Sequence, residues 1–201
     1  MQIEQATVFP PFDGGLSFLT LLYYYVRMKT NQIIDAMLSR KSCRAYSAER
    51  ISADELDAVV QAGLYAASGG GAQSAKLVVI TNKKIRDTLS KLNADVMKTA
   101  SDPFYGAPEV IAVLADSSVP TFVEDGSLVI GNMLLAASSL GLGACWIHRA
   151  REVFRSQEGR LLKKQWGISD SFEGVGFCIV GHQAAPGKSY EHRADRIIRV
   201  N

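Results

Sequence analysis

A run of basic residues, Arg40-Lys41-Ser42-Cys43-Arg44, carries the clearest chemical signal in the sequence. In an extended segment, alternate side chains project from the same side, so Arg40, Ser42 and Arg44 would converge. Two guanidinium groups and a hydroxyl suit a phosphate, because arginine presents paired donors to oxyanions. The alternative is a solvated basic turn at the end of a helix, where cations also complement the helix dipole. This stretch alone leaves both interpretations open.

A glycine-rich loop from Ser68 to Ser74 is the second candidate for ligand binding. Its three successive glycines would let the backbone approach a ligand closely and donate N–H groups. Gln73 could offer its amide to the edge of a ring. The loop is not a Walker loop, because no GK[ST] follows, and it precedes a predicted strand, which excludes the dinucleotide fingerprint. A flexible connector is the alternative.

The segment from Gly141 to His148 joins a predicted helix to a predicted strand with small residues. Such a junction permits tight packing, or a planar ligand that lies on exposed backbone. His148 could be catalytic, although a structural or surface histidine is the more common case. We expect no metal site, because His182 and His192 lack a ligand spacing. We expect no serine hydrolase either, because no G-x-S-x-G elbow is present.

Length and composition indicate one soluble globular domain. The chain has 201 residues, of which 47% are hydrophobic and 21% are charged, as is ordinary for such proteins. The net charge of +2 is too small to favour nucleic acid or an acidic membrane as a partner. The three cysteines form no CxxC pair and are typical of free thiols in a reducing compartment. We therefore expect a cytoplasmic protein.

The first 27 residues differ from the rest of the chain. They contain no basic residue before Arg27, so they lack the positive region of a secretory signal. Their apolar run, Leu16 to Val26, is about half the length needed to cross a bilayer. We interpret residues 1–27 as an N-terminal extension, either a start-site artefact or an arm that packs on something. Residues 28–201 are then a single domain.

From Thr30 onward, helices and strands alternate and would position the candidate residues. Helical periodicity and caps predict helices from Thr30 or Asn31 to the basic run, after the capping box Ser52–Glu55, after Asn82 and over Val123–Leu140. They also predict one or two amphipathic helices over Glu152–Trp166. Apolar runs predict strands at Lys76–Thr81, Val110–Ala115, Ala144–Ile147 and Val175–Gly181. The pattern indicates an α+β fold with about four short strands in one sheet. The tail, Arg196 to Val200, alternates weakly and is either an edge strand or an arm.

Two of the predicted helices have a clear apolar face. On the first helix, this face contains Ile33, Ile34, Met37 and Leu38. On the second helix, it contains Leu56, Val59, Val60, Gly63 and Leu64.

Five motifs in the correct order resemble the FMN-dependent nitroreductase family. They are the run Met37–Tyr46 (MLSRKSCRAY), the loop AASGGGAQ, Val123-Glu124-Asp125-Gly126, Gly131-Asn132-Met133, and Gly141–Ile147 (GLGACWI). Each motif alone is weak, but the ordered set is specific. The resemblance covers the chain from about Thr30 to Asn201.

The resemblance implies a homodimeric α+β fold with a central, mostly antiparallel sheet flanked by helices. It implies FMN at the dimer interface, held by both subunits. NADH or NADPH would reduce the flavin, and a nitroaromatic, quinone or similar small molecule would reoxidise it in a ping-pong cycle. Because such a cofactor performs the hydride chemistry, the protein needs no catalytic acid, base or nucleophile of its own.

The resemblance also assigns a phosphate site. Arg40, Ser42 and Arg44 would hold the FMN phosphate and ribityl chain, with Lys41 contributing its backbone or its charge. A basic residue near the C-terminus would complete that site. The two candidates there are Arg193, which is favoured, and Lys188.

On the ring side, the resemblance implies contacts from two segments. Ser68, Gly69 and Gln73 would contact the isoalloxazine ring from the partner subunit. Ile147 and His148 would lie near the flavin N5 edge and contact it through backbone N–H groups.

Three departures from the family pattern affect these ring-side roles. Gly71 stands where many members have asparagine, and Ser74-Ala75 stand where many have Pro-Trp. His148 replaces a common glycine, which would narrow the pocket or add a proton donor. The alternatives to an enzyme are a non-catalytic flavin-binding redox sensor and a structural α+β protein whose basic run is only surface.

Overall fold

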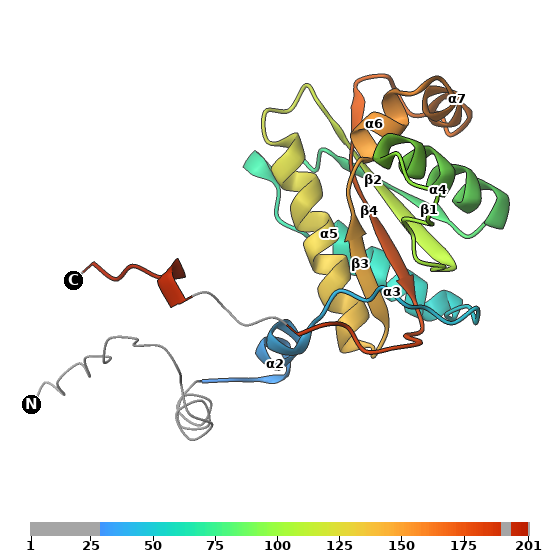
Figure 1. Ribbon diagram of the computed structural model, residues 1–201. Helices are drawn as coiled ribbons and strands as arrows, with labels where there is room; N and C mark the ends of the chain where they lie inside the picture. Colours follow the sequence, from blue (N-terminus) through green and yellow to red (C-terminus); the bar gives the residue numbers. More distant parts are fainter. Residues whose placement is uncertain (1–28, 190–193, 201) are drawn as a thin grey trace, which may run out of the picture. The chain divides into compact units, whose positions relative to one another are not determined.

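The four predicted strands form one antiparallel sheet (Figure 1). They are β1 (Ala75–Ile80), β2 (Glu109–Asp116), β3 (Gly143–Ile147) and β4 (Phe172–Gly181), in the spatial order β1-β2-β4-β3. The central strands β2 and β4 are buried over most of their length, so β2 reads as the continuous apolar run typical of a covered strand. β1 and β3 are the two edges of the sheet.

In this computed structural model, the described residues are 29–189 and 194–200. The chain divides into two units, one of residues 32–188 and one of the two ends, 1–31 with 189–201. Within the end unit, residues 194–200 contain a short 3-10 helix, η2 (Ala194–Arg196), and no strand. The predicted extension over residues 1–27 lies outside the described residues.

One face of the sheet is covered by two helices. α3 (Ala53–Leu64) and α5 (Phe122–Ser139) pack there, and Val59, Ile130 and Met133 are fully buried between the layers. Burial of this kind is the main stabilising contribution, at about 25 cal/mol per Å² of apolar surface. Within the described residues, no helix is long and apolar enough to span a bilayer.

The other face carries a second hydrophobic core. It is covered by α4 (Lys83–Met97), α6 (Ala150–Arg155) and α7 (Gln157–Gln165). Aromatic rings from a helix and from the sheet meet there, with the centroids of Phe154 and Phe177 5.8 Å apart. The result is a three-layer α/β/α arrangement, which confirms the predicted α+β class with an antiparallel sheet flanked by helices.

Local capping signals define where two of the helices begin. The Ser52 hydroxyl accepts a hydrogen bond from the Glu55 N–H, and the Glu55 carboxylate accepts one from the Ser52 N–H. The Asn82 side chain accepts from Lys84 and Ile85 at the start of α4. Both caps satisfy N–H groups that have no partner within the helix, and both confirm the predicted starts.

The segment Glu152–Trp166, predicted to contain one or two helices, is covered by two, α6 and α7. Ser156 interrupts it in an extended conformation (φ −64°, ψ 161°), and its side chain caps α7 by accepting from the Gly159 N–H at 3.0 Å. The hydrophobic periodicity continues across the break, which is why the sequence left one or two helices open. Serine competes with the helical backbone in this way.

The apolar face of the first helix is not covered by the rest of the described chain. α2 (Gln32–Ser39) has no buried residue, and Ile33, Met37 and Leu38 are 63%, 55% and 53% exposed. Leu64, at the end of the apolar stripe on α3, is 51% exposed. Exposed apolar surface of this kind marks an interaction site more often than a free surface.

Candidate functional site

The basic segment, residues 40–44, lies along the outer edge of β3. Ser42 forms a parallel bridge with Ala144, and the Cys43 N–H donates to the Ala144 carbonyl at 3.0 Å. A second bridge pairs Tyr46 with Gln183, just after β4. These main-chain contacts hold the segment extended at the sheet edge, which is the conformation that the predicted alternation of side chains requires.

The side chains of this segment alternate as predicted. Cys43 is buried, with 1% of its surface exposed, and its Sγ would lie 2.8 Å from a Cβ at Gly143. Only glycine at position 143 therefore leaves room for the Cys43 side chain. Arg40 and Ser42 are half-buried and Arg44 is exposed, so they lie on the side away from Cys43.

All three predicted phosphate ligands act on one buried thiol. Burial raises the pKa of the Cys145 thiol, and Arg44, a hydrogen bond with Ser42, and Arg40 each oppose that rise. Because one thiol interacts with all three, Arg40, Ser42 and Arg44 lie around the same point of β3. The structure thus brings them together, while their role toward a phosphate stays a prediction.

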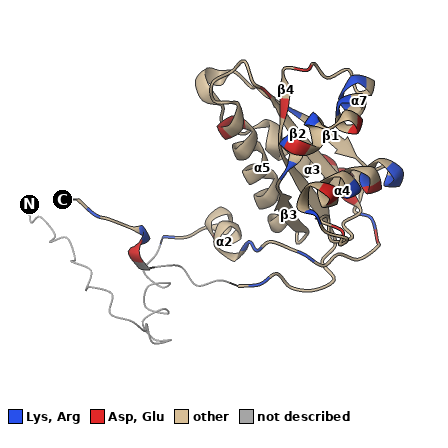
Figure 2. Ribbon diagram, turned by 45° about the horizontal axis from the view of Figure 1, so that its top comes forward, with Lys and Arg blue, Asp and Glu red and all other residues tan. Residues whose placement is uncertain are grey.

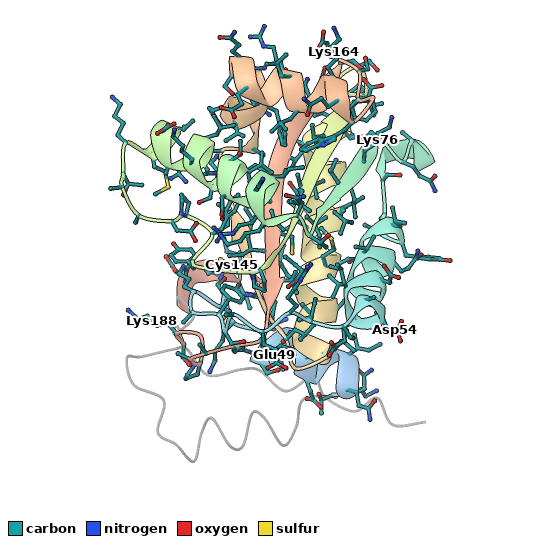
Figure 3. The ribbon with its side chains drawn as sticks, turned by 90° about the vertical axis from the view of Figure 1, so that its right-hand side faces the viewer. Glu49, Asp54, Lys76, Cys145, Lys164 and Lys188 are labelled. Atoms are coloured by element: carbon teal, nitrogen blue, oxygen red, sulfur yellow. The ribbon has the colours of Figure 1, made fainter. Side chains whose placement is uncertain are left out.

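Lys188 approaches the basic segment from the C-terminal side. A Cβ at Gly187 would meet the Lys41 Cβ at 2.7 Å and the Ser42 carbonyl oxygen at 2.9 Å, so the Gly187 backbone touches this segment. Lys188 is exposed, and Figure 3 shows it at the same end of the molecule as α2. Arg193, the favoured candidate, lies outside the described residues.

Lysine and arginine residues also lie on α4 and α7 (Figure 2). Two of those on α4 are engaged in ion pairs. Lys83 pairs with Asp87, and Arg86 pairs with Asp87 and with Asp102 in the loop that follows the helix. These charges close a loop and stabilise a helix surface, so they are not candidates for ligand binding.

The glycine-rich loop is held by a buried carboxylate to which the sequence assigned no role. Asp125, in the first turn of α5, is 2% exposed and accepts from the Gly69 N–H at 2.9 Å and from the Ser74 hydroxyl at 2.6 Å. The hydrogen bonds from Ser74 and Gly69 lower the pKa of Asp125. The Gly69 N–H is therefore used inside the chain. The only sequence signal was the position of Asp125 in the VEDG motif.

The tip of the loop is exposed and has a defined backbone. Gly70, Gly71 and Gln73 have φ angles of +58°, +71° and +47°, and the Ser68 hydroxyl accepts from the Gln73 N–H at 3.0 Å. A left-handed conformation favours glycine and also suits asparagine. This explains physically how Gly71 can stand where many family members have asparagine.

At the end of β3, the main-chain groups point alternately to β4 and to the open edge. The Ala144 carbonyl faces the outer edge, where it accepts from the basic segment. In an antiparallel strand this orientation repeats every second residue, so the main-chain groups of Trp146, still within β3, also face outward. Ile147 is 6% exposed and pairs with Phe177 in β4. Within β3, an outward backbone donor is therefore expected from Trp146 rather than from Ile147, while the role of the His148 N–H stays a prediction.

The turn after β3 is fixed by a buried side chain. Asn93 of α4 is fully buried and donates from Nδ2 to the His148 carbonyl at 2.7 Å. The residue with left-handed backbone is Arg149, at φ +74°, whereas His148 has no positive φ. The backbone of Arg149 would therefore suit a glycine, while the comparison of His148 with a family glycine stays a prediction. The exposed side chain of His148 has no catalytic partner defined by the structure.

The basic segment and the glycine-rich loop lie at opposite ends of the sheet. The segment meets β3 at Ala144, near the end of the sheet where β2 begins. The loop joins the sheet where β1 begins and β2 ends, with the Asp116 N–H donating to the Ser74 carbonyl at 3.0 Å. A strand of eight residues, such as β2, spans roughly 25 Å. Within the described residues, one chain does not bring the two groups together.

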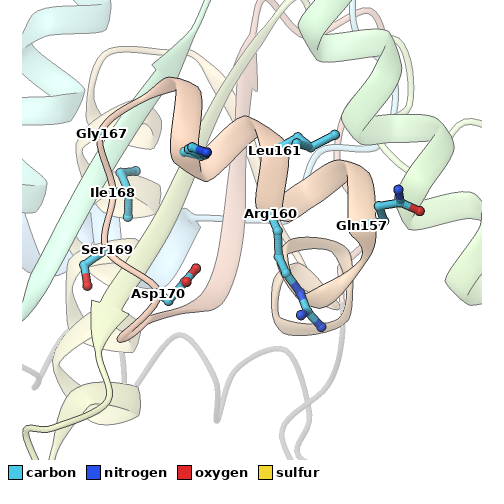
Figure 4. A pocket seen from close by; sticks show the side chains of 8 residues that line it. Gln157, Arg160, Leu161, Gly167, Ile168, Ser169 and Asp170 are labelled. Carbon is cyan, nitrogen blue, oxygen red and sulfur yellow. The ribbon is translucent and has the colours of Figure 1, made fainter.

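A hollow of about 880 Å³ lies elsewhere, on α7 and the loop after it (Figure 4). Arg160, Lys164, Ile168 and Asp170 are among the residues that line it. It contains none of the predicted site residues and is open to solvent. The size of a hollow alone therefore does not locate the candidate site.

Comparison with known proteins defines the class to which this fold and this segment belong. The model of the nitroreductase family matches residues 37–109 and 97–182, which include the basic segment, the glycine-rich loop, Asp125 and all four strands. The chain belongs to the nitroreductase family. The resemblance inferred from the five motifs is confirmed.

Individual relatives agree with that membership. A nitroreductase with bound FMN from Bacteroides fragilis has a TM-score of 0.79 and 26% identity, over 86% of this chain and 100% of that one. A protein of Archaeoglobus fulgidus, named as a candidate NADH dehydrogenase/NAD(P)H nitroreductase, is 28% identical over 74% of this chain and 83% of its own length. A relative of the same name from Methanothermobacter thermautotrophicus is 29% identical, over 57% of this chain and 59% of the relative's length.

Proposed function

We propose that the chain is an FMN-dependent oxidoreductase that takes electrons from NADH or NADPH. The observation that carries the proposal is the gathering of Arg40, Ser42 and Arg44 around one point of β3, with Lys188 close to the same segment. Membership of the nitroreductase family supports it. So do the FMN bound by the Bacteroides fragilis protein and the names of the archaeal relatives.

The chemistry of this donor set fits a phosphate group. Arg40 and Arg44 offer planar forks of N–H donors, Ser42 offers a hydroxyl, and Lys188 offers a point charge. The nearby Cys145 thiol does not oppose an anion, because burial raises the pKa of this thiol and keeps it neutral near pH 7. Bonds between ionised groups at a partly buried strand edge are stronger than those in open water.

When bound, FMN would supply the hydride chemistry. The residues of the chain would then bind and orient it. Arg40, Ser42 and Arg44 would hold its phosphate, and the N–H groups of Trp146 and His148 would donate to polar atoms of its ring. No side chain is required to act as a nucleophile or as a general acid or base.

We infer that a homodimer completes the site. The basic segment and the glycine-rich loop lie at opposite ends of one sheet, so a loop near the segment must come from a second copy. The exposed apolar residues Ile33, Met37 and Leu38 of α2 supply surface for such an interface. Gln73, at the exposed tip of the loop, is then the residue best placed to reach the partner's flavin.

We propose a ping-pong order, in which the oxidised nicotinamide leaves before a nitroaromatic, a quinone or a similar acceptor binds. The resemblance to the family supports this order. Kinetics at several fixed acceptor concentrations would test it, because parallel double-reciprocal lines are expected. Intersecting lines would contradict it.

The absorbance spectrum of the purified protein tests the whole proposal. We expect a yellow protein that loses its colour when NADH or NADPH is added without oxygen, and regains it when a nitroaromatic acceptor follows. A yellow protein that neither nucleotide bleaches would indicate a flavin-binding sensor. A colourless protein whose Tm does not rise on addition of FMN would indicate a structural role.

A further inference from the structure

A small recess opens beside the end of β3, next to the candidate ring-side residues. Its volume is about 140 Å³, and its walls come from the start of α5, the end of β3, the start of α6 and the first half of β4. The residues that bear charge or polar groups in it are Ser127, Trp146, His148, Arg149, Arg151 and Glu152.

Basic side chains predominate in this recess. Arg149 and Arg151 line it together with His148, against a single carboxylate, that of Glu152. Among residues 29–189 and 194–200, neither guanidinium has an ion-pair partner. The Arg151 guanidinium lies over the ring of Phe122, 5.8 Å from its centroid. The pKa of Arg155 is raised mainly by Glu173 and to a smaller extent by Glu152. The charge of Glu152 therefore also acts on Arg155, outside the recess.

The backbone that carries Arg149 is held in place. Its left-handed φ of +74° is unfavourable for a residue with a Cβ and persists only where the surroundings impose it. The buried Asn93 imposes it by its hydrogen bond to the preceding carbonyl, that of His148. Arg149 thus lies beside the recess although its backbone conformation would suit glycine better.

We propose that Arg149 and Arg151 form an anion subsite for the electron acceptor, so that the protein prefers acceptors that carry a carboxylate near the group to be reduced. This inference rests on the proposed function. Arginine forks match carboxylate oxygens. The recess has the volume of about four or five water molecules, which admits a carboxylate and the edge of a ring but not a nucleotide.

Steady-state kinetics with a matched pair of acceptors test the subsite. The probes are 4-nitrobenzoate and the neutral 4-nitrobenzamide, each with saturating NADH. In Arg149→Gly, which suits the left-handed backbone, and in Arg151→Ala, the ratio of kcat/KM for the acid to that for the amide should fall roughly tenfold, the loss expected for one charge-assisted contact. Arg149→Lys should recover part of the ratio. Arg160→Ala on α7, far from the recess, should leave it unchanged.

The outcomes separate the inference from the function on which it rests. If wild-type protein holds no flavin and reduces neither acceptor, the proposed function fails. If it reduces both and the ratio is the same in all variants, the function stands and the subsite is overturned. An effect on KM for NADPH but not for NADH, with the acceptor ratio unchanged, would assign the arginines to the 2′-phosphate of the donor and would also overturn the acceptor subsite.

Discussion

Arg40, Ser42 and Arg44, the proposed phosphate ligands, show how the placement of such a group depends on buried neighbours. Their orientation is set by Cys43, which packs into the space left by Gly143, and by the main-chain bond to Ala144. Buried residues position exposed segments at two other places in the chain. Asp125 and Asn93 are buried, and each holds the backbone of an exposed segment by a hydrogen bond.

Replacing Arg44 by alanine should weaken FMN binding by about 1.5–3 kcal/mol, the usual contribution of a hydrogen bond to a charged group. Titration of the apoprotein with FMN, followed by quenching of flavin fluorescence, measures this directly. Arg160→Ala is the matched control, because it removes an arginine from α7 without touching β3. Equal affinity of Arg44→Ala and the control would remove Arg44 from the site.

At the scale of elements, the candidate site consists of segments attached to the sheet rather than of parts of it. The basic segment is bridged to the edge of β3. The glycine-rich loop is attached to the first turn of α5, and the turn after β3 is attached to α4. Each attachment relies on one or two polar bonds. Each can therefore be broken without removing a hydrophobic core.

Replacing Asp125 by alanine should release the glycine-rich loop while the fold is retained. The Gly69 N–H and the Ser74 hydroxyl would lose their acceptor, so hydrogen exchange at residues 69–74 should become faster. Far-UV circular dichroism should not change. Glu124→Ala is the matched control, since Glu124 is the exposed neighbour in the same helical turn. Unchanged exchange in Asp125→Ala would show that the loop is held by other contacts.

The loop after α4 gives a prediction about pH. Burial would raise the pKa of Asp102, but hydrogen bonds from Arg86, Ser90, Gly106 and Phe104 outweigh it and lower this pKa below its ordinary value. A lowered carboxyl pKa contributes stability that is complete above about pH 4. That stability is lost as the pH falls through the folded-state pKa.

The advantage of wild type over Asp102→Asn in unfolding free energy should therefore shrink as the pH falls from about 5 to about 3. Urea unfolding at each pH measures it. Asp95→Asn, at an exposed position on the same helix, is the control. A constant difference between wild type and Asp102→Asn over this range would contradict the role of the ionised carboxylate.

At the scale of the whole molecule, the described residues of one chain do not bring all the candidate FMN ligands together. Two groups of candidate ligands lie at opposite ends of the sheet, and the apolar face of α2 is exposed. The proposed association of two copies would resolve both features, because it would cover the apolar surface and bring a loop of one copy to the basic segment of the other.

Dilution should therefore release FMN at the protein concentration at which the dimer dissociates. Sedimentation velocity reports the dimer, and recovery of free flavin fluorescence reports the release, so the two curves should coincide. Gln73→Ala should loosen FMN in the dimer without changing the dissociation curve. A monomer that keeps its flavin would show that one chain forms the complete site.

The sequence by itself determined the features that depend on neighbouring residues. Alternating or continuous apolar runs located all four strands, and the side chains of Ser52 and Asn82 located two helix starts, because these signals act within a few residues. The alternation of Arg40, Ser42 and Arg44 is also local. The ordered motifs then identified the family, which the comparison confirmed, while the roles of individual residues toward FMN remain predictions.

Only the tertiary structure decided which distant residues meet. Asp125 lies 56 residues from Gly69, and Asn93 lies 55 residues from the His148 carbonyl that it holds. No periodicity in the sequence specifies such pairs, because they depend on how the strands are ordered and which helix covers which face. The left-handed backbone at Arg149 and the exposure of α2 have the same origin. Both are set by packing partners far along the chain rather than by local preference.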